Sequence, residues 1–148
     1  MGSSIRKVEF RSAVKILEDM LLTLPQVEIK TRHYRAAGLY AREITIPAGT
    51  VLTGQIHKYE HLNIVSAGRI VIATDSGPQL IEAPYAVVSA PGTKRAGYTL
   101  NDTVWTTIHA TDKVSIEELE RELVTNDYEG FGLTDEALDR LEELKWPG

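Results

Sequence analysis

The chain has 148 residues, a formal net charge of −5, and 43% hydrophobic and 25% charged residues, which fits one soluble globular domain with a hydrophobic core. It contains no cysteine, which excludes disulfides, thiolate metal sites and cysteine nucleophiles. No apolar run reaches the roughly 20 residues that a membrane span needs. Residues 114–148 carry a net charge of −8 and residues 29–113 carry +3, a weaker basic footprint than duplex nucleic-acid binding usually shows.

The first predicted element is an amphipathic helix. From Ser12 to Leu24 apolar residues recur at helical spacing, with Ser12 as its N-cap and Pro25 as its end. We therefore interpret residues 1–26 as an N-terminal helical extension.

From residue 27 to residue 112 the hydrophobic period changes to two. Short runs rich in Val, Ile, Thr and Tyr alternate with turn clusters such as Pro47-Ala48-Gly49 and Ala90-Pro91-Gly92. Strands with this spacing and punctuation predict an all-β sandwich or barrel of antiparallel strands.

The helical period returns in residues 113–148, which we interpret as an acidic helical extension. Ser115 and Glu118 form a capping box ahead of Leu119 and Leu123. A second helix is predicted over Asp135–Lys145.

A spaced motif lies inside the predicted barrel. Five residues separate Gly49 from Gln55, one separates Gln55 from His57, three separate His57 from His61, and six separate His61 from Gly68. This spacing resembles the first signature of the cupin superfamily, with Gln55 at the first histidine position and His61 at the glutamate position.

The second cupin signature has a weaker counterpart in the stretch that contains Pro91 and Gly92, and it places Arg95 where the family has its last histidine. The resemblance covers about residues 39–111. It implies a cupin-type antiparallel barrel, or jelly roll, whose cavity would bring Gln55, His57, His61 and Arg95 together.

Most cupins hold a transition metal with three histidines and a glutamate. Gln55, His57 and His61 could still bind a divalent transition metal, which is one hypothesis. A guanidinium in the fourth position argues against it, because arginine stays protonated and repels a cation. The preferred hypothesis therefore has no cofactor.

The same residues suit a small anionic ligand. Arg95 can bind a phosphate or carboxylate bidentately, while His57 and His61, which ordinarily titrate near neutral pH, serve as base and acid. The leading hypothesis is thus a metal-independent cupin that binds, and in its stronger form cleaves, a phosphorylated ligand such as a nucleotide, with His57, His61 and Arg95 as catalytic residues. The alternatives are a metal-dependent oxygenase or isomerase, and a non-catalytic structural or interaction module.

Several neighbours are further ligand-binding candidates. Besides Gln55, these polar, cationic or aromatic residues are Arg42, Asn63, Lys94, Tyr98, Asn101 and Trp105. His109 shares a strand face with Trp105 and Thr107 and is a weaker candidate, and His33 is assigned no role.

The whole chain is also similar to small cupin-like proteins of tailed bacteriophages, through the stretches Tyr40–Ile44, Glu60–Ile64 and Asp102–Thr107. This resemblance implies a counter-defence role against nucleotide signals in the host-cell cytoplasm. A cytoplasmic location is expected in any case, because the chain shows no signal peptide. We further predict a homodimer or higher homo-oligomer, because cupins commonly dimerise and open sheet edges need cover.

Overall fold

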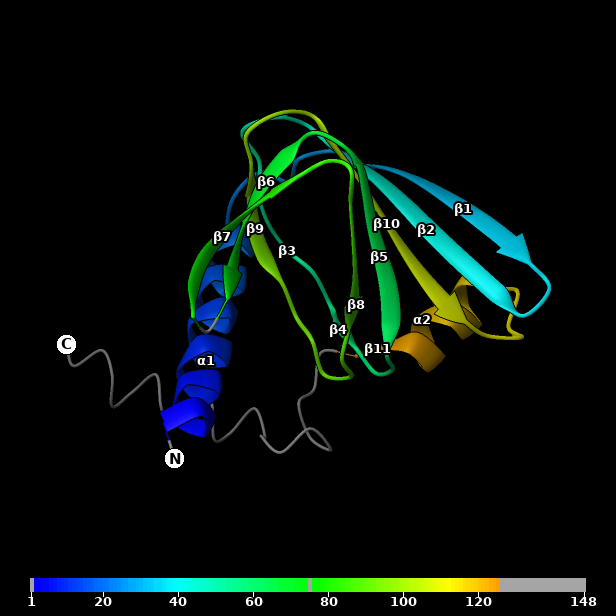
Figure 1. Ribbon diagram of the computed structural model, residues 1–148, viewed down its shortest axis with the longest axis horizontal. Helices are drawn as coiled ribbons and strands as arrows, with labels where there is room; N and C mark the ends of the chain where they lie inside the picture. Colours follow the sequence, from blue (N-terminus) through cyan, green and yellow to red (C-terminus); the bar gives the residue numbers. More distant parts are fainter. Residues whose placement is uncertain (1, 75, 126–148) are drawn as a thin grey trace.

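The structure, a computed structural model, describes residues 2–74 and 76–125, with side chains described from residue 9 onward. Figure 1 shows a β-barrel flanked by two helices. The larger sheet runs in the order β1 (Lys30–Ala36), β2 (Leu39–Ile46), β10 (Thr103–Ala110), β5 (His61–Ala67) and β8 (Tyr85–Ser89). The smaller sheet runs in the order β3 (Val51–Thr53), β9 (Ala96–Thr99), β6 (Arg69–Thr74) and β7 (Gly77–Glu82). A short pair joins β4 (Ile56–His57) to β11 (Val124–Thr125).

The topology is that of a jelly roll. Every described strand pair is antiparallel, and the orders β2-β10-β5-β8 and β3-β9-β6-β7 give the two four-stranded layers of that fold, to which β1 adds an edge strand. The prediction of an all-β antiparallel jelly-roll barrel is confirmed.

The two layers enclose the core because side chains alternate along each strand. In β5, His61, Asn63 and Val65 are buried, and Leu62 between them is exposed. Val65 and Trp105 from the larger sheet pack against three isoleucines of the smaller sheet, Ile70, Ile72 and Ile81.

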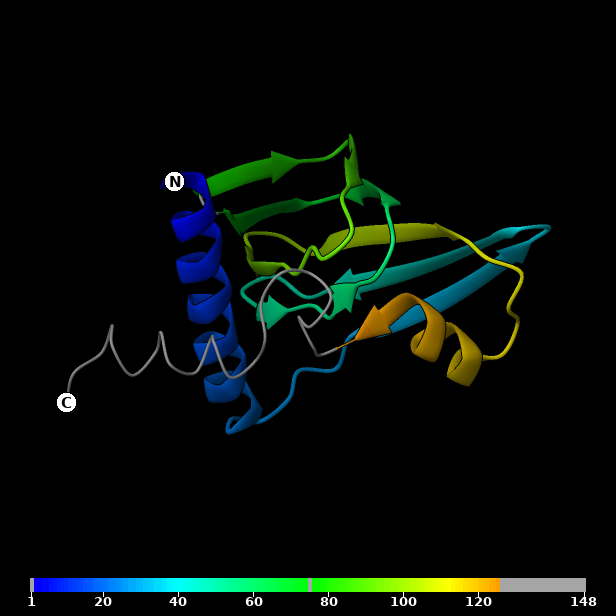
Figure 2. The ribbon, with the colours of Figure 1, turned by 90° about the horizontal axis from the view of Figure 1, so that it is seen from below.

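The N-terminal helix, α1, spans Gly2–Leu22, so it begins ten residues earlier and ends two residues earlier than predicted. No proline interrupts the first eleven residues, and Ser12 is not an N-cap but a buried residue within the helix. Glu18 of α1 forms an ion pair with Lys94 at 2.7 Å and accepts a hydrogen bond from Thr53 Oγ1 at 3.0 Å. Figure 2 shows α1 along one side of the barrel.

The second helix, α2, spans Ile116–Leu123 and confirms Ser115 as its N-cap. The Ser115 side chain accepts a hydrogen bond from the Glu118 backbone N–H at 3.2 Å. Leu119 and Leu123 pack against Tyr40 of β2, which holds α2 against the larger sheet. The helix predicted over Asp135–Lys145 lies outside the described residues. Among the described helices, none is long and apolar enough to span a membrane.

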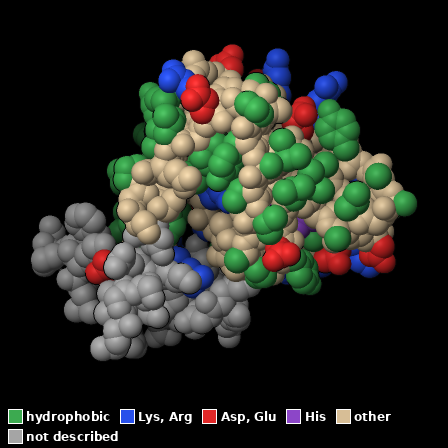
Figure 3. Space-filling view, in the orientation of Figure 1, with side chains coloured by type: hydrophobic (Ala, Val, Ile, Leu, Met, Phe, Trp, Pro, Cys, Tyr) green, Lys and Arg blue, Asp and Glu red, His purple; other side chains and the backbone are tan. Residues whose placement is uncertain are grey.

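The outer face of the larger sheet has an apolar surface. Leu62 and Val88 are 37% and 60% exposed, and they are cross-strand partners. Ile64 and Ala86 form the next pair, and Ile108 lies opposite Leu62 on β10. Figure 3 shows hydrophobic side chains gathered over the region of β5 and β8. Antiparallel sheets usually show a polar outer face to water, so this surface is unusual.

Candidate functional site

The strand register places the site residues in rows across the inner face of the larger sheet. Because one face of a strand carries every second residue, the rows lie about 6.7 Å apart. The first row contains Tyr40, His109, His61 and Ser89. The second contains Arg42, Thr107, Asn63 and Val87. The third contains Ile44, Trp105, Val65 and Tyr85. The inner face therefore changes from polar to apolar along the strands.

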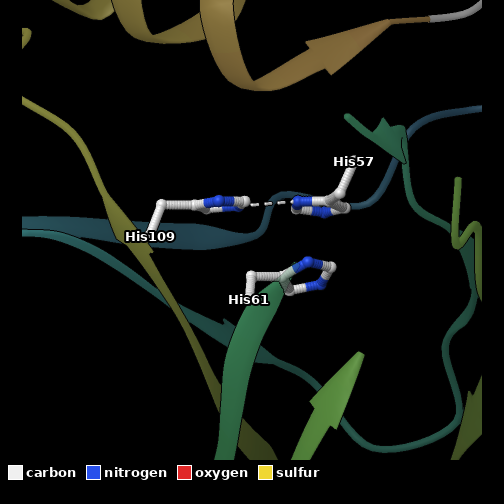
Figure 4. A group of neighbouring side chains, drawn as sticks. All are labelled: His57, His61 and His109. Atoms are coloured by element: carbon white, nitrogen blue, oxygen red, sulfur yellow. Dashed lines mark hydrogen bonds between the residues drawn. The ribbon is translucent and has the colours of Figure 1, made fainter. Parts of the chain in front are cut away.

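A cluster of three histidines occupies the polar end. His61 and His109 come from the first row, and His57 reaches them from β4 (Figure 4). The ring centroids of His57 and His61 are 4.2 Å apart, those of His61 and His109 4.9 Å, and those of His57 and His109 5.1 Å. One nitrogen of each ring lies within 4.8 Å of one nitrogen of both others, which is close enough for a single metal ion to contact all three.

The hydrogen bonds of the cluster fix one tautomer. His61 Nδ1 lies 2.9 Å from the Tyr59 carbonyl oxygen, so Nδ1 carries the hydrogen and donates it. Nε2 of His61 is then the nitrogen with the lone pair, and it is buried without a hydrogen-bond partner. His57 Nδ1 and His109 Nε2 are 2.9 Å apart, so one donates to the other.

The surroundings keep the three imidazoles neutral. Burial, followed by the nearby His61 and His109, lowers the pKa of His57 to about 3. Burial and the neighbouring His61 lower the pKa of His109 to about 4. Burial also lowers the pKa of His61, against the opposing effect of its bond to Tyr59. The expectation that His57 titrates near neutral pH is wrong, because burial among like groups disfavours the charged form, and the pKa of His61 is shifted in the same direction.

The cluster lines a cavity of about 300 Å³ between the two sheets. Gln55, Arg42, Asn63 and Arg95 contribute further polar groups to its wall. The apolar part of the wall consists of Ile44, Ile46, Leu52, Ile70, Ile72 and Trp105. Leu119, Glu120, Leu123 and Val124 of the α2–β11 segment cover the side next to His57.

A hydrogen-bond network, rather than an ion pair with a carboxylate, holds Arg95 in the cavity wall. Its guanidinium donates a hydrogen bond to Ser89 Oγ, which also accepts one from Asn63 Nδ2 at 2.9 Å. Asn63 Oδ1 in turn accepts from Trp105 Nε1 at 3.0 Å, and the guanidinium carbon lies 5.2 Å from the centre of the Trp105 ring. No carboxylate of the described residues forms an ion pair with Arg95.

Six of the predicted site residues line this one cavity, namely Gln55, His57, Asn63, Arg42, Arg95 and Trp105, and His61 belongs to the histidine cluster that borders it. Three others lie elsewhere. Lys94, one of the ligand-binding candidates, is instead buried against α1 in its ion pair with Glu18. Tyr98 is 44% exposed on β9, and the side chain of Asn101 accepts a hydrogen bond from Arg69 Nε at 2.8 Å.

Sequence reasoning ranked His109 too low. The family spacing placed Arg95 at the position of the last histidine, but the third imidazole comes from β10 instead. The signal was the alternation that puts Trp105, Thr107 and His109 on one face. His33 and Tyr40 also line the cavity, and His33 Nδ1 bonds to the Tyr40 hydroxyl at 2.6 Å.

Comparisons with known proteins show partial likeness in fold. Neither a protein-family model nor a curated protein matches the sequence. Among solved structures, the chain is similar to KdgF from Halomonas sp., with 16% identity and a TM-score of 0.49, covering 60% of this chain and 87% of that one. A cupin domain from Bordetella pertussis has 10% identity and a TM-score of 0.46, covering 60% and 98%. An acetylacetone dioxygenase from Acinetobacter johnsonii has 13% identity and a TM-score of 0.47, covering 59% and 66%.

Proposed function

We propose that the protein is a metal-dependent enzyme of the cupin type, with His57, His61 and His109 as the ligands of one divalent transition metal ion and a small organic molecule as its substrate. The observation that carries this proposal is the meeting of three imidazoles from three separate strands at one end of a cavity between the two sheets. The case against a metal placed Arg95 in the position of a ligand. In the structure His109 supplies the third imidazole instead, and Arg95 is bonded to Ser89 in the adjacent wall, although its charge still acts on His57 and His61.

The residues fit such an ion. His61 Nε2 is a buried lone-pair nitrogen without a partner, an arrangement that costs about 1–3 kcal/mol when nothing binds it. Its Nδ1–H is bonded to the Tyr59 carbonyl, the kind of second contact that orients metal-bound histidines. Three neutral imidazoles suit zinc, copper, iron and nickel, and three protein ligands leave further positions for substrate or water.

The chain's own residues would divide the remaining work. A bound divalent ion supplies Lewis acidity to an oxygen atom of the substrate. Arg95 neutralises negative charge on the substrate from the adjacent wall, and its bonds through Ser89 and Asn63 hold it in place. Leu119 and Leu123 keep bulk water from the histidine side of the cavity.

Metal analysis of the purified protein tests the proposal directly. We expect one ion per chain, its removal by chelator, and its return on titration with Fe²⁺, Mn²⁺, Ni²⁺ or Zn²⁺. His109→Ala should weaken metal affinity by at least about tenfold, because it removes one of three ligands. His33→Ala is the matched control, since His33 lines the same cavity outside the cluster. Wild-type protein that takes up none of these ions would refute the proposal.

A second candidate is metal-free binding of an anionic ligand such as a nucleotide. The guanidinium of Arg95, without an acidic partner among the described residues, favours it. Hydrolysis by a pair of histidines is less well supported, because neither His57 nor His109 has a pKa that would leave it protonated at neutral pH. Ligand binding that is unchanged by chelator, together with no metal uptake, would support this candidate over the first.

A further inference from the structure

The cavity has two chemically different ends. Its polar groups belong to the first two rows of the larger sheet and to the facing segment with Gln55, His57 and Arg95. In the third row and beyond, Ile44, Ile46 and Trp105 line it, and Leu52, Ile70 and Ile72 face them from the smaller sheet. Two row spacings, about 13 Å, separate the histidine row from the Trp105 row along the strands.

The polar end carries unbalanced positive charge. Arg42 and Arg95 both line the cavity, and neither forms an ion pair with a carboxylate of the described residues. Glu120 is the acidic residue among those that line the cavity. Arg95 is half-buried, and a guanidinium partly removed from water without a counter-ion is costly, so this end, with the exposed Arg42 in the same wall, is suited to receive an anion from solution.

The apolar end offers almost nothing to a polar ligand. Its side chains are aliphatic except for Trp105, whose only donor is already bonded to Asn63 Oδ1. A ribose or a base placed there would lose its hydrogen bonds to water without replacement, at about 1–3 kcal/mol for each group. A hydrocarbon or aromatic body loses nothing and gains from leaving water.

From these two ends we infer the chemical class of the ligand: an organic oxyanion with an apolar body, whose acid group pairs with Arg95 near the histidines and whose body lies against Leu52, Ile70 and Trp105. The inference rests on the proposed function in that it names the substrate class of the same cavity. It replaces the nucleotide that the sequence suggested. Carboxylates and phosphonates share the required chemistry, so both are probed below.

Binding is measured by calorimetry and by tryptophan fluorescence, on chelator-treated protein and again on metal-loaded protein. The probes are benzoate, cyclohexanecarboxylate and phenylphosphonate. Acetate lacks the body, benzyl alcohol lacks the charge, and adenosine monophosphate carries an anion on a polar body. We expect at least one ring acid to bind at least about tenfold more tightly than all three comparison compounds. The ratio of benzoate to phenylphosphonate affinity identifies the preferred oxyanion. Equal binding of acetate and benzoate, or tighter binding of adenosine monophosphate, would overturn the inference.

Two pairs of variants locate the two ends. Arg95→Gln should weaken ring-acid binding at least about tenfold, whereas Arg69→Gln, which changes an exposed arginine bonded to Asn101, should not. Leu52→Asn should weaken ring-acid binding without changing acetate binding, whereas Leu80→Asn on exposed β7 should change neither. Arg95→Lys keeps the charge and serves if Arg95→Gln does not fold. Unchanged ring-acid binding in a folded Arg95→Gln variant would contradict the inference.

The outcomes separate this inference from the proposed function. If the protein takes up metal but shows no preference for ring acids, the inferred ligand class is wrong and the proposed metal site stands. If the protein prefers ring acids but takes up no metal, the inferred ligand class stands and the proposed metal site is wrong. Two variants provide the internal check through different readouts: His109→Ala should weaken metal affinity at least about tenfold, and Arg95→Gln should weaken ring-acid binding to the chelator-treated protein.

Discussion

His57 Nδ1 lies 2.9 Å from His109 Nε2, although 52 residues separate them in the chain. The contact needs both rings to be neutral or to share one proton, since two imidazolium groups would both donate and repel each other. Because protonation of both rings would break this contact, the stability of the fold depends on pH.

The chelated protein should become less stable as pH falls. The folded pKa values of about 3 for His57 and about 4 for His109 lie below the unfolded value of 6.5. Between those values the unfolded chain binds protons that the folded chain does not, so the free energy of unfolding falls with decreasing pH. We expect a loss of on the order of 4 kcal/mol between about pH 7 and pH 5, measured by urea unfolding. A double His57→Gln, His109→Gln variant should flatten this dependence, and His33→Gln should not. A stability that is constant over this range would contradict the lowered pKa values.

Gly68→Ala should destabilise the barrel strongly. Gly68 has a φ of +89°, and a Cβ there would lie 2.3 Å from the Asp102 carbonyl oxygen and 2.6 Å from Thr103 Oγ1. Left-handed backbone and overpacking together predict a loss of about 3 kcal/mol. Gly38→Ala is the control, because Gly38 has a φ of +73° but open space around it, and about 1 kcal/mol is expected. Thermal unfolding of both variants measures the difference, and equal losses would show that the close approach to Asp102 is unimportant.

Glu18→Gln should release α1 from the barrel. The variant would leave the Lys94 side chain, 5% exposed, without its ion-pair partner, at a cost of about 2 kcal/mol. Asp112→Asn is the matched control, because Asp112 is 87% exposed in its pair with Lys113 and exposed pairs contribute little. Calorimetric unfolding would reveal the effect, and similar small changes in both variants would argue that the buried pair does not hold the helix.

The homo-oligomer predicted from the sequence stays a prediction, and the apolar outer face of the larger sheet is where we expect the contact. Light scattering at micromolar concentration should give twice the monomer mass for the wild type. Val88→Lys should shift the protein to monomer, because a charge would be buried in the contact. Leu80→Lys, on exposed β7 of the other sheet, should leave the dimer intact. A monomeric wild type would end this prediction.

Local patterns predict the barrel well because strand alternation and turn residues act over a few positions. His57 and His61 could be predicted for the same reason, since a short motif contains both. The side of the sheet on which His109 lies depends instead on the pairing register of strands that are far apart in the sequence. The pairing of β10 with β5 shifts between Val104 and Trp105, and a slip of one residue would turn His109 to the outside. Spacing alone therefore favoured Arg95 at the third histidine position.

The wrong expectation about histidine titration also arises from contacts between residues that are distant in the sequence. A histidine read alone is given its ordinary pKa near 6.5, whereas these three are buried against one another by strands that the motif does not include.

The helix α1 extends beyond its predicted start because the first eleven residues contain no strong stop signal, and apolar spacing alone did not reach them.

Strand β4, which carries His57, is two residues long, and β11 is its paired strand among the described residues. Lys58 strengthens the junction by donating its backbone N–H to Leu123 O at 2.7 Å and its Nζ to Arg121 O at 2.6 Å. The consequence is kinetic. The Lys58 amide can exchange its hydrogen with water only when the α2–β11 segment detaches, so its exchange rate reports the local unfolding of this segment beside His57.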